Sequence, residues 1–328
     1  MFSHILVPLD ESRLAEHVLP HVTALAPLDG ARVTLLNVLE PPSTAVVAQQ
    51  AEPVEWQLGM RRAQSYLEAV KERLERHGVQ AAVELIEGDP TTSILEFVKR
   101  NGVDLIALTS HGAGGEERHC LGQVALRTLL GAKISVLLVR SFNPVFATLP
   151  RSGTADVVAS YSRVLVPLDG SLRAEAALPY AERLCHTAGG CLHAVTVVRP
   201  TSQWADEGDG GDAQHRRAAH KATLDRARGY LDGVSRAASA PHRLLKTAVI
   251  DDADVVGSID SLAISEESEL LVMSAHGASG GTRTPYGAAT LDLLIYGYAP
   301  LLVVQDRSPR DLRESHAERA SRERQGHG

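Results

Sequence analysis

The chain has 328 residues, of which 44% are hydrophobic, 22% are charged and only 4% are aromatic, so any buried core is mainly aliphatic. A formal net charge of −7 argues against partners that need a basic surface, namely nucleic acid and anionic membranes. The three cysteines are an odd number that forms no disulfide framework, and no apolar run approaches the roughly 20 residues of a membrane span. With a predicted strand starting close to Met1 and no signal-type leader, we expect a cytoplasmic protein.

Strands and helices alternate along the first half of the chain. Short apolar runs predict strands, and apolar residues spaced three or four apart predict helices. The predicted strands are Ile5–Leu9, Val33–Val38, Ala82–Ile86, Asp104–Thr109 and Ser135–Val139. Helices are predicted after Ser12 and over Arg62–His77, Thr92–Arg100 and Val124–Leu130.

The second half repeats the first. The segment His4–Ser12 (HILVPLDES) returns as Arg163–Ser171 (RVLVPLDGS), and a His-Gly pair follows the fourth predicted strand in each half, at His111 and at His276. The corresponding strands are predicted at Val164–Leu168, Cys191–Val198, Leu244–Ile250, Leu270–Ser274 and Leu301–Val304. Such self-similarity indicates a tandem of two similar domains.

The predicted fold class is therefore α/β, with two tandem Rossmann-like domains. Continuously apolar strands that alternate with helices are typical of a parallel sheet covered by helices on both faces. We expect one domain over residues 1–140, a linker over 141–160 and a second domain over 161–305. The polar stretch 205–212 is expected to be a mobile loop, and the polar tail 306–328 to be disordered, with a solvated helix as its alternative.

Ligands of parallel α/β sheets bind at the carboxyl ends of the strands. Two elements of each half converge there: the exit of the first strand, with Asp10 or Asp169, and a glycine-rich loop after the fourth strand. The loop glycines recur at identical spacing, Gly112 with Gly122 and Gly277 with Gly287. Glycines have no side chain, so an anion can approach the backbone amides closely. The N-terminus of the following helix, its positive end, points at the same place. This predicts a nucleotide phosphate site; the alternative is an ordinary turn between strand and helix.

On these residues the chain resembles the universal stress proteins in a tandem two-domain form. The markers are the Val-Pro-Leu-Asp-x-Ser opening of each half, Gly88-Asp89-Pro90, the Ser-His-Gly type of loop and the apolar last strand, and they cover nearly all of residues 2–305. The resemblance implies a five-stranded parallel sheet in each domain. It also implies an intramolecular pseudo-dimer paired through the last strands, with a homodimer as a further assembly. In the ATP-binding branch, it implies an ATP site.

Carried over position by position, the resemblance implies two sets of nucleotide-binding residues. The Asp after strand one and the Val at the end of strand two would hold adenine, and the glycine loop and the next helix would hold the phosphates. In the first domain the set is Pro8, Leu9, Asp10, Val38, Thr109, Gly112, Gly122, Gln123 and Val124. In the second it is Pro167, Leu168, Asp169, Val197, Ser274, Gly277, Gly287 and Ala288.

Both domains depart from the family pattern of glycines followed by Ser or Thr. Thr109 and Ser274 stand where the first glycine is expected. Gln123 replaces the final hydroxyl residue with a longer donor, whereas Ala288 has no donor. The loop of the first domain carries Glu116 and Glu117, which oppose a polyphosphate, and the second carries Arg283, which favours one. Because exposed charges are screened and a lost donor is not, we expect ATP to favour the first domain.

Several other interpretations stay open. Asp10 and Asp169 could cap the helices that follow them, and His111 and His276 could act as general bases or simply bind the loop backbone. Cys185, His186, Cys191 and His193 resemble zinc ligands by type, but their strand and helix positions do not converge, so no metal is expected.

The sequence predicts a stress-response protein that binds adenine nucleotide weakly and works as a regulated interaction module, with a protein partner that it does not identify. No nucleophile with its base, no Walker lysine and no acidic metal pair recurs in both halves, so an enzyme is the least favoured class. The alternatives are a nucleotide-free scaffold for protein interaction and a slow ATPase.

Overall fold

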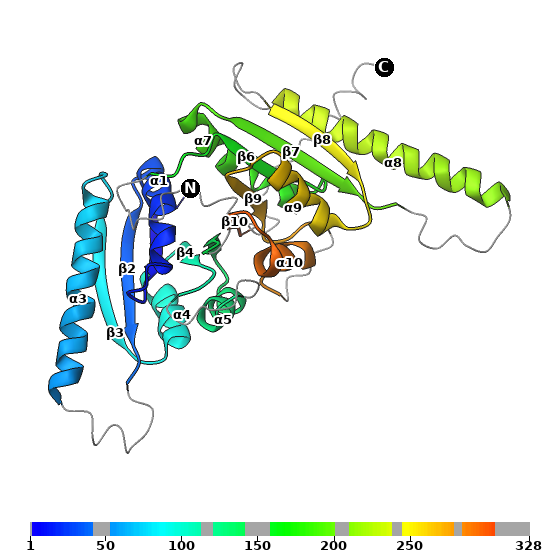
Figure 1. The fold of residues 1–328 in the computed structure, drawn as a ribbon. Coiled ribbons are helices and arrows are strands. Elements are labelled where there is room, and N and C mark those ends of the chain that lie inside the picture. The colour runs from blue at the N-terminus through cyan, green and yellow to red at the C-terminus, as the bar shows by residue number, and fades with distance from the viewer. Residues whose placement is uncertain are drawn as a thin grey trace. The chain divides into compact units, whose positions relative to one another are not determined.

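The structure, a computed structural model, describes residues 2–41, 53–112, 121–141, 158–200, 210–237, 245–278 and 284–305. The chain divides into two compact units, Met1–Ser160 with Pro300–Leu302 and Tyr161–Ala299 with Val303–Gly328, and each is a parallel α/β unit (Figure 1). The expected pairing of the two last strands concerns the relation between the units and stays a prediction. Expectations for the tail 306–328 and for most of the linker lie outside the described residues.

The first unit contains the predicted succession of strands and helices. Its described elements are β1 (His4–Pro8), η1 (Ala15–Val18), α1 (Leu19–Asp29), β2 (Arg32–Leu39), α3 (Pro53–Glu75), β3 (Ala81–Glu87), α4 (Pro90–Asn101), β4 (Leu105–Thr109), α5 (Gln123–Gly131) and β5 (Ser135–Val139). The strands lie in the order β3-β2-β1-β4-β5.

The second unit repeats this arrangement. Its described elements are β6 (Arg163–Pro167), α6 (Leu172–Glu175), α7 (Leu178–Ala188), β7 (Cys191–Val198), α8 (Gly210–Ala237), β8 (Leu245–Asp251), α9 (Val255–Ser265), β9 (Leu270–Ser274), α10 (Ala288–Tyr296) and β10 (Leu301–Val304). The order β10-β9-β6-β7-β8 corresponds strand for strand to that of the first unit.

The burial of each strand matches its place in the sheet. Every residue of β4, β5, β9 and β10 is buried, as expected for strands covered on both faces. The outer strand β3 instead alternates between half-buried and exposed residues over much of its length, and α3 packs against it. The predicted α/β class with a parallel sheet in each half is confirmed.

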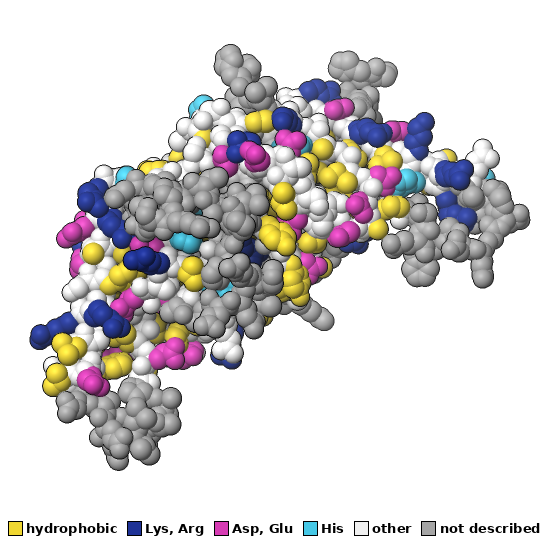
Figure 2. Space-filling view, viewed as in Figure 1, with side chains coloured by type: hydrophobic (Ala, Val, Ile, Leu, Met, Phe, Trp, Pro, Cys, Tyr) yellow, Lys and Arg dark blue, Asp and Glu magenta, His cyan; other side chains and the backbone are white. Residues whose placement is uncertain are grey.

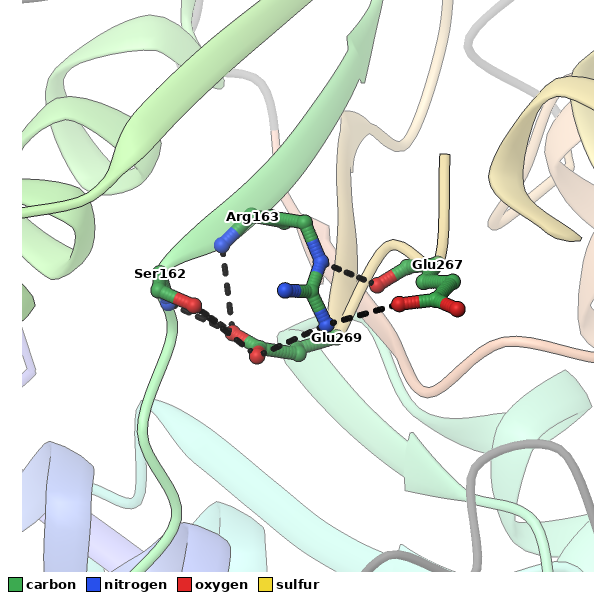
Figure 3. Close-up of polar contacts among 4 residues, drawn as sticks. All are labelled: Ser162, Arg163, Glu267 and Glu269. Carbon is green, nitrogen blue, oxygen red and sulfur yellow. Dashed lines mark hydrogen bonds and ion pairs between the residues drawn. The ribbon is translucent and has the colours of Figure 1, made fainter. Parts of the chain in front are cut away.

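A carboxylate fixes the start of the first strand to the start of the fourth strand in both units. Asp104 accepts hydrogen bonds from the Ser3 amide at 2.8 Å and from the His4 amide at 3.0 Å. Glu269 likewise accepts from the amide and hydroxyl of Ser162 and from the Arg163 amide (Figure 3). These contacts pin the register of the strand pair whose opposite ends carry Asp10 and the glycine loop.

Two predicted boundaries were wrong. Helix α3 begins at Pro53, well before the predicted Arg62, because a Pro in the first turn suits a helix start and the apolar periodicity there is weak. Residues 210–212, expected in a mobile loop, belong to α8, since the repeat demands a long helix before β8 and overrides the local glycine content. Residues 205–209 lie outside the described part of the chain.

The charged side chains on the surface and the hydropathy of the helices match what the composition led us to expect. Figure 2 shows acidic and basic side chains interspersed over the visible face rather than gathered into a patch of one sign. Among the described residues, none of the helices combines the length and the hydropathy needed to cross a bilayer.

Buried histidines in the first unit make its stability depend on pH. His21 on α1 is 4% exposed, and burial together with the neighbouring His17 lowers its pKa to about 4. Burial also lowers the pKa values of His17 and His4. The unfolded chain therefore binds protons that the folded chain does not, from pH 6.5 downward.

We predict that the free energy of unfolding of the first unit falls as the pH falls from 6.5 to about 4. A shift of this size at His21 corresponds to about 3 kcal/mol, lost progressively over that window and present in full above it. Denaturant titrations across this range should show a shallower slope for His21→Gln. The exposed His186→Gln is the control, and an equal slope in wild type and His21→Gln would contradict the prediction.

Candidate functional site

A cavity of about 810 Å³ lies in the first unit at the carboxyl ends of the strands, a volume typical of sites for small ligands. The ends of β1, β2 and β4 and the first turns of α4 and α5 form its wall. It brings together every position predicted for the first domain: Pro8, Leu9, Asp10, Val38, Thr109, Gly112, Gly122, Gln123 and Val124. The sequence did not place in the site Leu36, Pro90, Ile94, Leu108, Ala125 or Thr128, which also line it.

Asp10 and Gly112 approach each other so closely that no side chain fits between them. A Cβ built on Gly112 would overlap the Asp10 carboxylate, and a Cβ on Gly277 would overlap that of Asp169. Neither glycine has a positive φ, so the requirement is for space. The sequence analysis explained this glycine by the access of an anion to the backbone. The space taken by the Asp10 carboxylate is a second reason why a residue without a side chain is needed here.

The Asp side chains do not cap the following helices. Asp10 accepts from the Ser12 amide at 3.1 Å and Asp169 from the Ser171 amide at 3.0 Å, which is an Asx turn. Ser171 is the N-cap of α6 and accepts from the Ala174 amide, whereas Ser12 accepts from the Ala15 amide ahead of η1, whose N-cap, Leu14, makes no side-chain cap. Asp169 also accepts from the Ala278 amide at 2.7 Å, so it ties the first strand to the glycine loop.

The helices after the glycine loops start without a side-chain cap. The N-caps of α5 and α10 are Gly122 and Gly287, whose own amides donate to the carbonyls of Ser110 and Ala275 at 2.8 Å. By contrast, Asp89 caps α4 and Asp254 caps α9. The first turn of α5 therefore presents backbone amides and the positive end of the helix dipole at the cavity, where an anion would be stabilised.

The residues that replace the first family glycine shape the loop. The hydroxyl of Thr109 donates to the His111 carbonyl at 2.8 Å, and that of Ser274 donates to the His276 carbonyl at 2.6 Å. These bonds use the hydroxyls within their own loops. The departure from glycine therefore stabilises the turn in both domains.

The two loop histidines are buried and bound to the surrounding chain. Nδ1 of His111 lies 3.0 Å from the Ser110 hydroxyl, and its backbone amide and carbonyl both bond the Ser141 hydroxyl. Nε2 of His276 donates to the Thr284 carbonyl at 2.8 Å. Of the two open interpretations, this geometry favours a role in holding the loop.

In the second domain, Gly277 lies against the Asp169 carboxylate as Gly112 lies against that of Asp10, but other residues nearby differ; the rest of the set, Pro167, Leu168, Val197, Ser274, Gly287 and Ala288, stays a prediction. Tyr286, at the position of Leu121, is buried, and burial raises its pKa. Ala288 begins α10 where the exposed Gln123 begins α5. The loop charges Glu116, Glu117 and Arg283 lie outside the described residues, so the comparison of loop charge stays a prediction.

The structure describes all four of the cysteine and histidine residues that resemble zinc ligands by type. Cys185 is buried and its thiol lies 3.5 Å from the Cys191 carbonyl, while burial lowers the pKa of His193 on β7. Within the described ranges, no three His, Cys, Asp or Glu side chains are arranged to hold a metal ion.

Comparisons with known proteins identify relatives of this chain. The sequence profile of the universal stress protein family matches residues 1–140 and 160–305. A universal stress protein of Methanocaldococcus jannaschii is 30% identical over 141 residues, 43% of this chain and 83% of that protein. One from Bacillus subtilis is 28% identical, over 43% of this chain and 100% of its own length. The crystal structure of a universal stress protein from Archaeoglobus fulgidus shares the fold, with a TM-score of 0.60 at 20% identity over 92% of this chain and 98% of that one.

The contact between Asp10 and Gly112 can be tested by a double-mutant cycle. We expect Gly112→Ala to lower the free energy of unfolding by about 1–2 kcal/mol, because the added methyl displaces the carboxylate and its Asx turn. In the Asp10→Ala background the same change should cost much less, since the obstructing atoms are gone. Additive effects of the two changes in denaturant titrations would show that the contact is not the constraint.

Proposed function

Because this chain belongs to the universal stress protein family, we propose that it is a cytoplasmic regulatory module of the stress response whose first domain binds ATP weakly. The proposed domains are residues 1–140 and 161–305, joined by 141–160. The observation that carries the proposal is the cavity of about 810 Å³ that gathers the adenine-side and phosphate-side positions in one place.

The proposed site has two chemically different ends. Leu36, Val38 and Ile94 give an apolar wall suited to the faces of a base. Asp10 offers a carboxylate that accepts hydrogen bonds from a ribose hydroxyl or an exocyclic amine. At the other end, the uncapped first turn of α5 and the amide of Gln123 suit phosphate oxygens. A nucleotide fits this order of groups.

A signalling role for the bound nucleotide fits the loop better than turnover does. The His111 ring lies against the Ser110 hydroxyl and its backbone is tied to Ser141, which supports a structural role for this histidine. Nucleotide bound against the start of α5 would then change the surface offered to a protein partner. A nucleotide-free scaffold and a slow ATPase are the competing functions. Nucleotide that co-purifies without being hydrolysed favours a regulatory binder over both.

We predict that Asp10→Ala lowers the affinity for ATP by about tenfold or more in isothermal titration calorimetry. A hydrogen bond to a charged partner contributes about 1.5–3 kcal/mol, which sets this range. The matched control is Asp169→Ala in the second domain, which we expect to leave the tight binding event unchanged. If Asp10→Ala binds ATP as wild type does, the carboxylate serves only the Asx turn.

A second prediction concerns the missing donor of the second domain. Ala288→Ser should raise the ATP affinity of that domain by about tenfold, equivalent to ~1.4 kcal/mol. Calorimetry in the Asp10→Ala background isolates the second site. If wild-type protein instead binds ATP in the second domain with the first empty, then loop charge outweighs the donor and our order of the domains is reversed.

A further inference from the structure

Glu40 brings a carboxylate to the cavity of the first unit. It directly follows β2 and lines the cavity together with Leu36 and Val38. Alternate residues of a strand share one face, so these three form a row that runs from the apolar wall to a carboxylate. Glu40 is exposed, and within the described part of the chain it forms no hydrogen bond or ion pair. A ligand in the cavity therefore meets a carboxylate that no described side chain neutralises.

The charged side chains that line this cavity are acidic. Asp10 adds a second carboxylate, and the described residues of the lining include no Lys or Arg. The opposing positive charge comes from the first turn of α5, whose N-cap Gly122 makes no side-chain cap. A helix N-terminus is equivalent to about half an elementary charge, which balances only part of the two carboxylates. A ligand with one phosphate meets less repulsion here than a ligand with three.

The second unit has the opposite charge at the position of Glu40. Arg199 directly follows β7 as Glu40 follows β2, and both residues are exposed. The two strand ends are held alike, because the Leu39 carbonyl accepts from the Gly88 amide and the Val198 carbonyl from the Asp252 amide, each at 3.0 Å. The same backbone thus carries either charge at this position, and the fold alone does not explain a carboxylate in the cavity of the first unit.

We propose that Glu40 is a specificity residue that disfavours phosphate-rich ligands, so that the first unit binds AMP more tightly than ATP. This inference rests on the proposed nucleotide site. ATP carries two phosphates more than AMP, and each adds negative charge. The repulsion from Glu40 acts across a cavity whose apolar walls focus the field, and salt screens it. Asp10 meets the ribose that both nucleotides share, so the discrimination between them is assigned to Glu40.

The test is to titrate AMP and ATP separately by calorimetry, at low salt and with EDTA so that no metal neutralises the phosphates. The Asp169→Ala background weakens any second site. We expect Glu40→Gln to raise the affinity for ATP about threefold and Glu40→Arg about tenfold, with a smaller factor for AMP in each case. Glu87→Gln is the matched control, because Glu87 is exposed at the end of β3, pairs with Leu39 in the sheet and is not among the lining residues.

The dependence on salt is a second readout. Raising the ionic strength from about 0.05 M to about 0.5 M should narrow the preference of the wild type for AMP, because screening weakens the repulsion of ATP most. Equal effects of Glu40→Gln on AMP and ATP would place Glu40 at the shared base or ribose and overturn the proposal. Tighter binding of ATP than of AMP by the wild type at low salt would also overturn it. If the wild type binds neither nucleotide, the proposed function falls with it.

Discussion

The parallel pairing of the first strand of each unit with the fourth is the constraint on which the rest of the site depends. In the first unit, Ile5 pairs with Leu105 and Leu6 with Ile106. The Asp104 carboxylate fixes the entry of this pair. Because the register of the two strands is fixed where they begin, the residues that follow their carboxyl ends are also placed, and Asp10 lies next to Gly112. The second unit repeats the device with Glu269 in place of Asp104, so the constraint survives a change of carboxylate length.

In both units a tyrosine of the long helix lies beside a carboxylate of the segment that follows the first strand. Tyr66 of α3 lies beside Glu16, and burial together with this carboxylate raises the pKa of its phenol. Tyr230 of α8 lies beside Glu175 with the same consequence. In the first unit Arg73 also reaches Glu16, at 2.6 Å. Because charged groups this close to the core require partners, the long helix is tied to the segment that follows the first strand.

The two units share a backbone but have diverged in chemistry near the site. Glu11 adopts a left-handed conformation, φ 64°, where the second unit has Gly170 at φ 84°. Its carboxylate bonds Arg62 of α3 at 2.8 Å, which helps to hold a conformation that a glycine would adopt without strain. The two units also differ at the start of the helix after the glycine loop, where Gln123 corresponds to Ala288 and Leu121 to Tyr286. The Asp after the first strand and the two loop glycines are the same in both units, whereas these positions differ.

The sequence by itself determined the tandem α/β architecture, because apolar strands repeating in one order leave few other folds. It also determined the placement of Asp10, Gly112 and Gly122 at one cavity, since parallel strands bring their carboxyl ends to one edge. It missed the early start of α3 and the helical residues 210–212, where tertiary packing overrides local propensity. Only the tertiary structure decided that Asp10 forms an Asx turn with the Ser12 amide and that His111 is tied into its loop. The physical reason is that hydrogen-bond partners and burial depend on residues far apart in the chain, which periodicity and spacing do not encode.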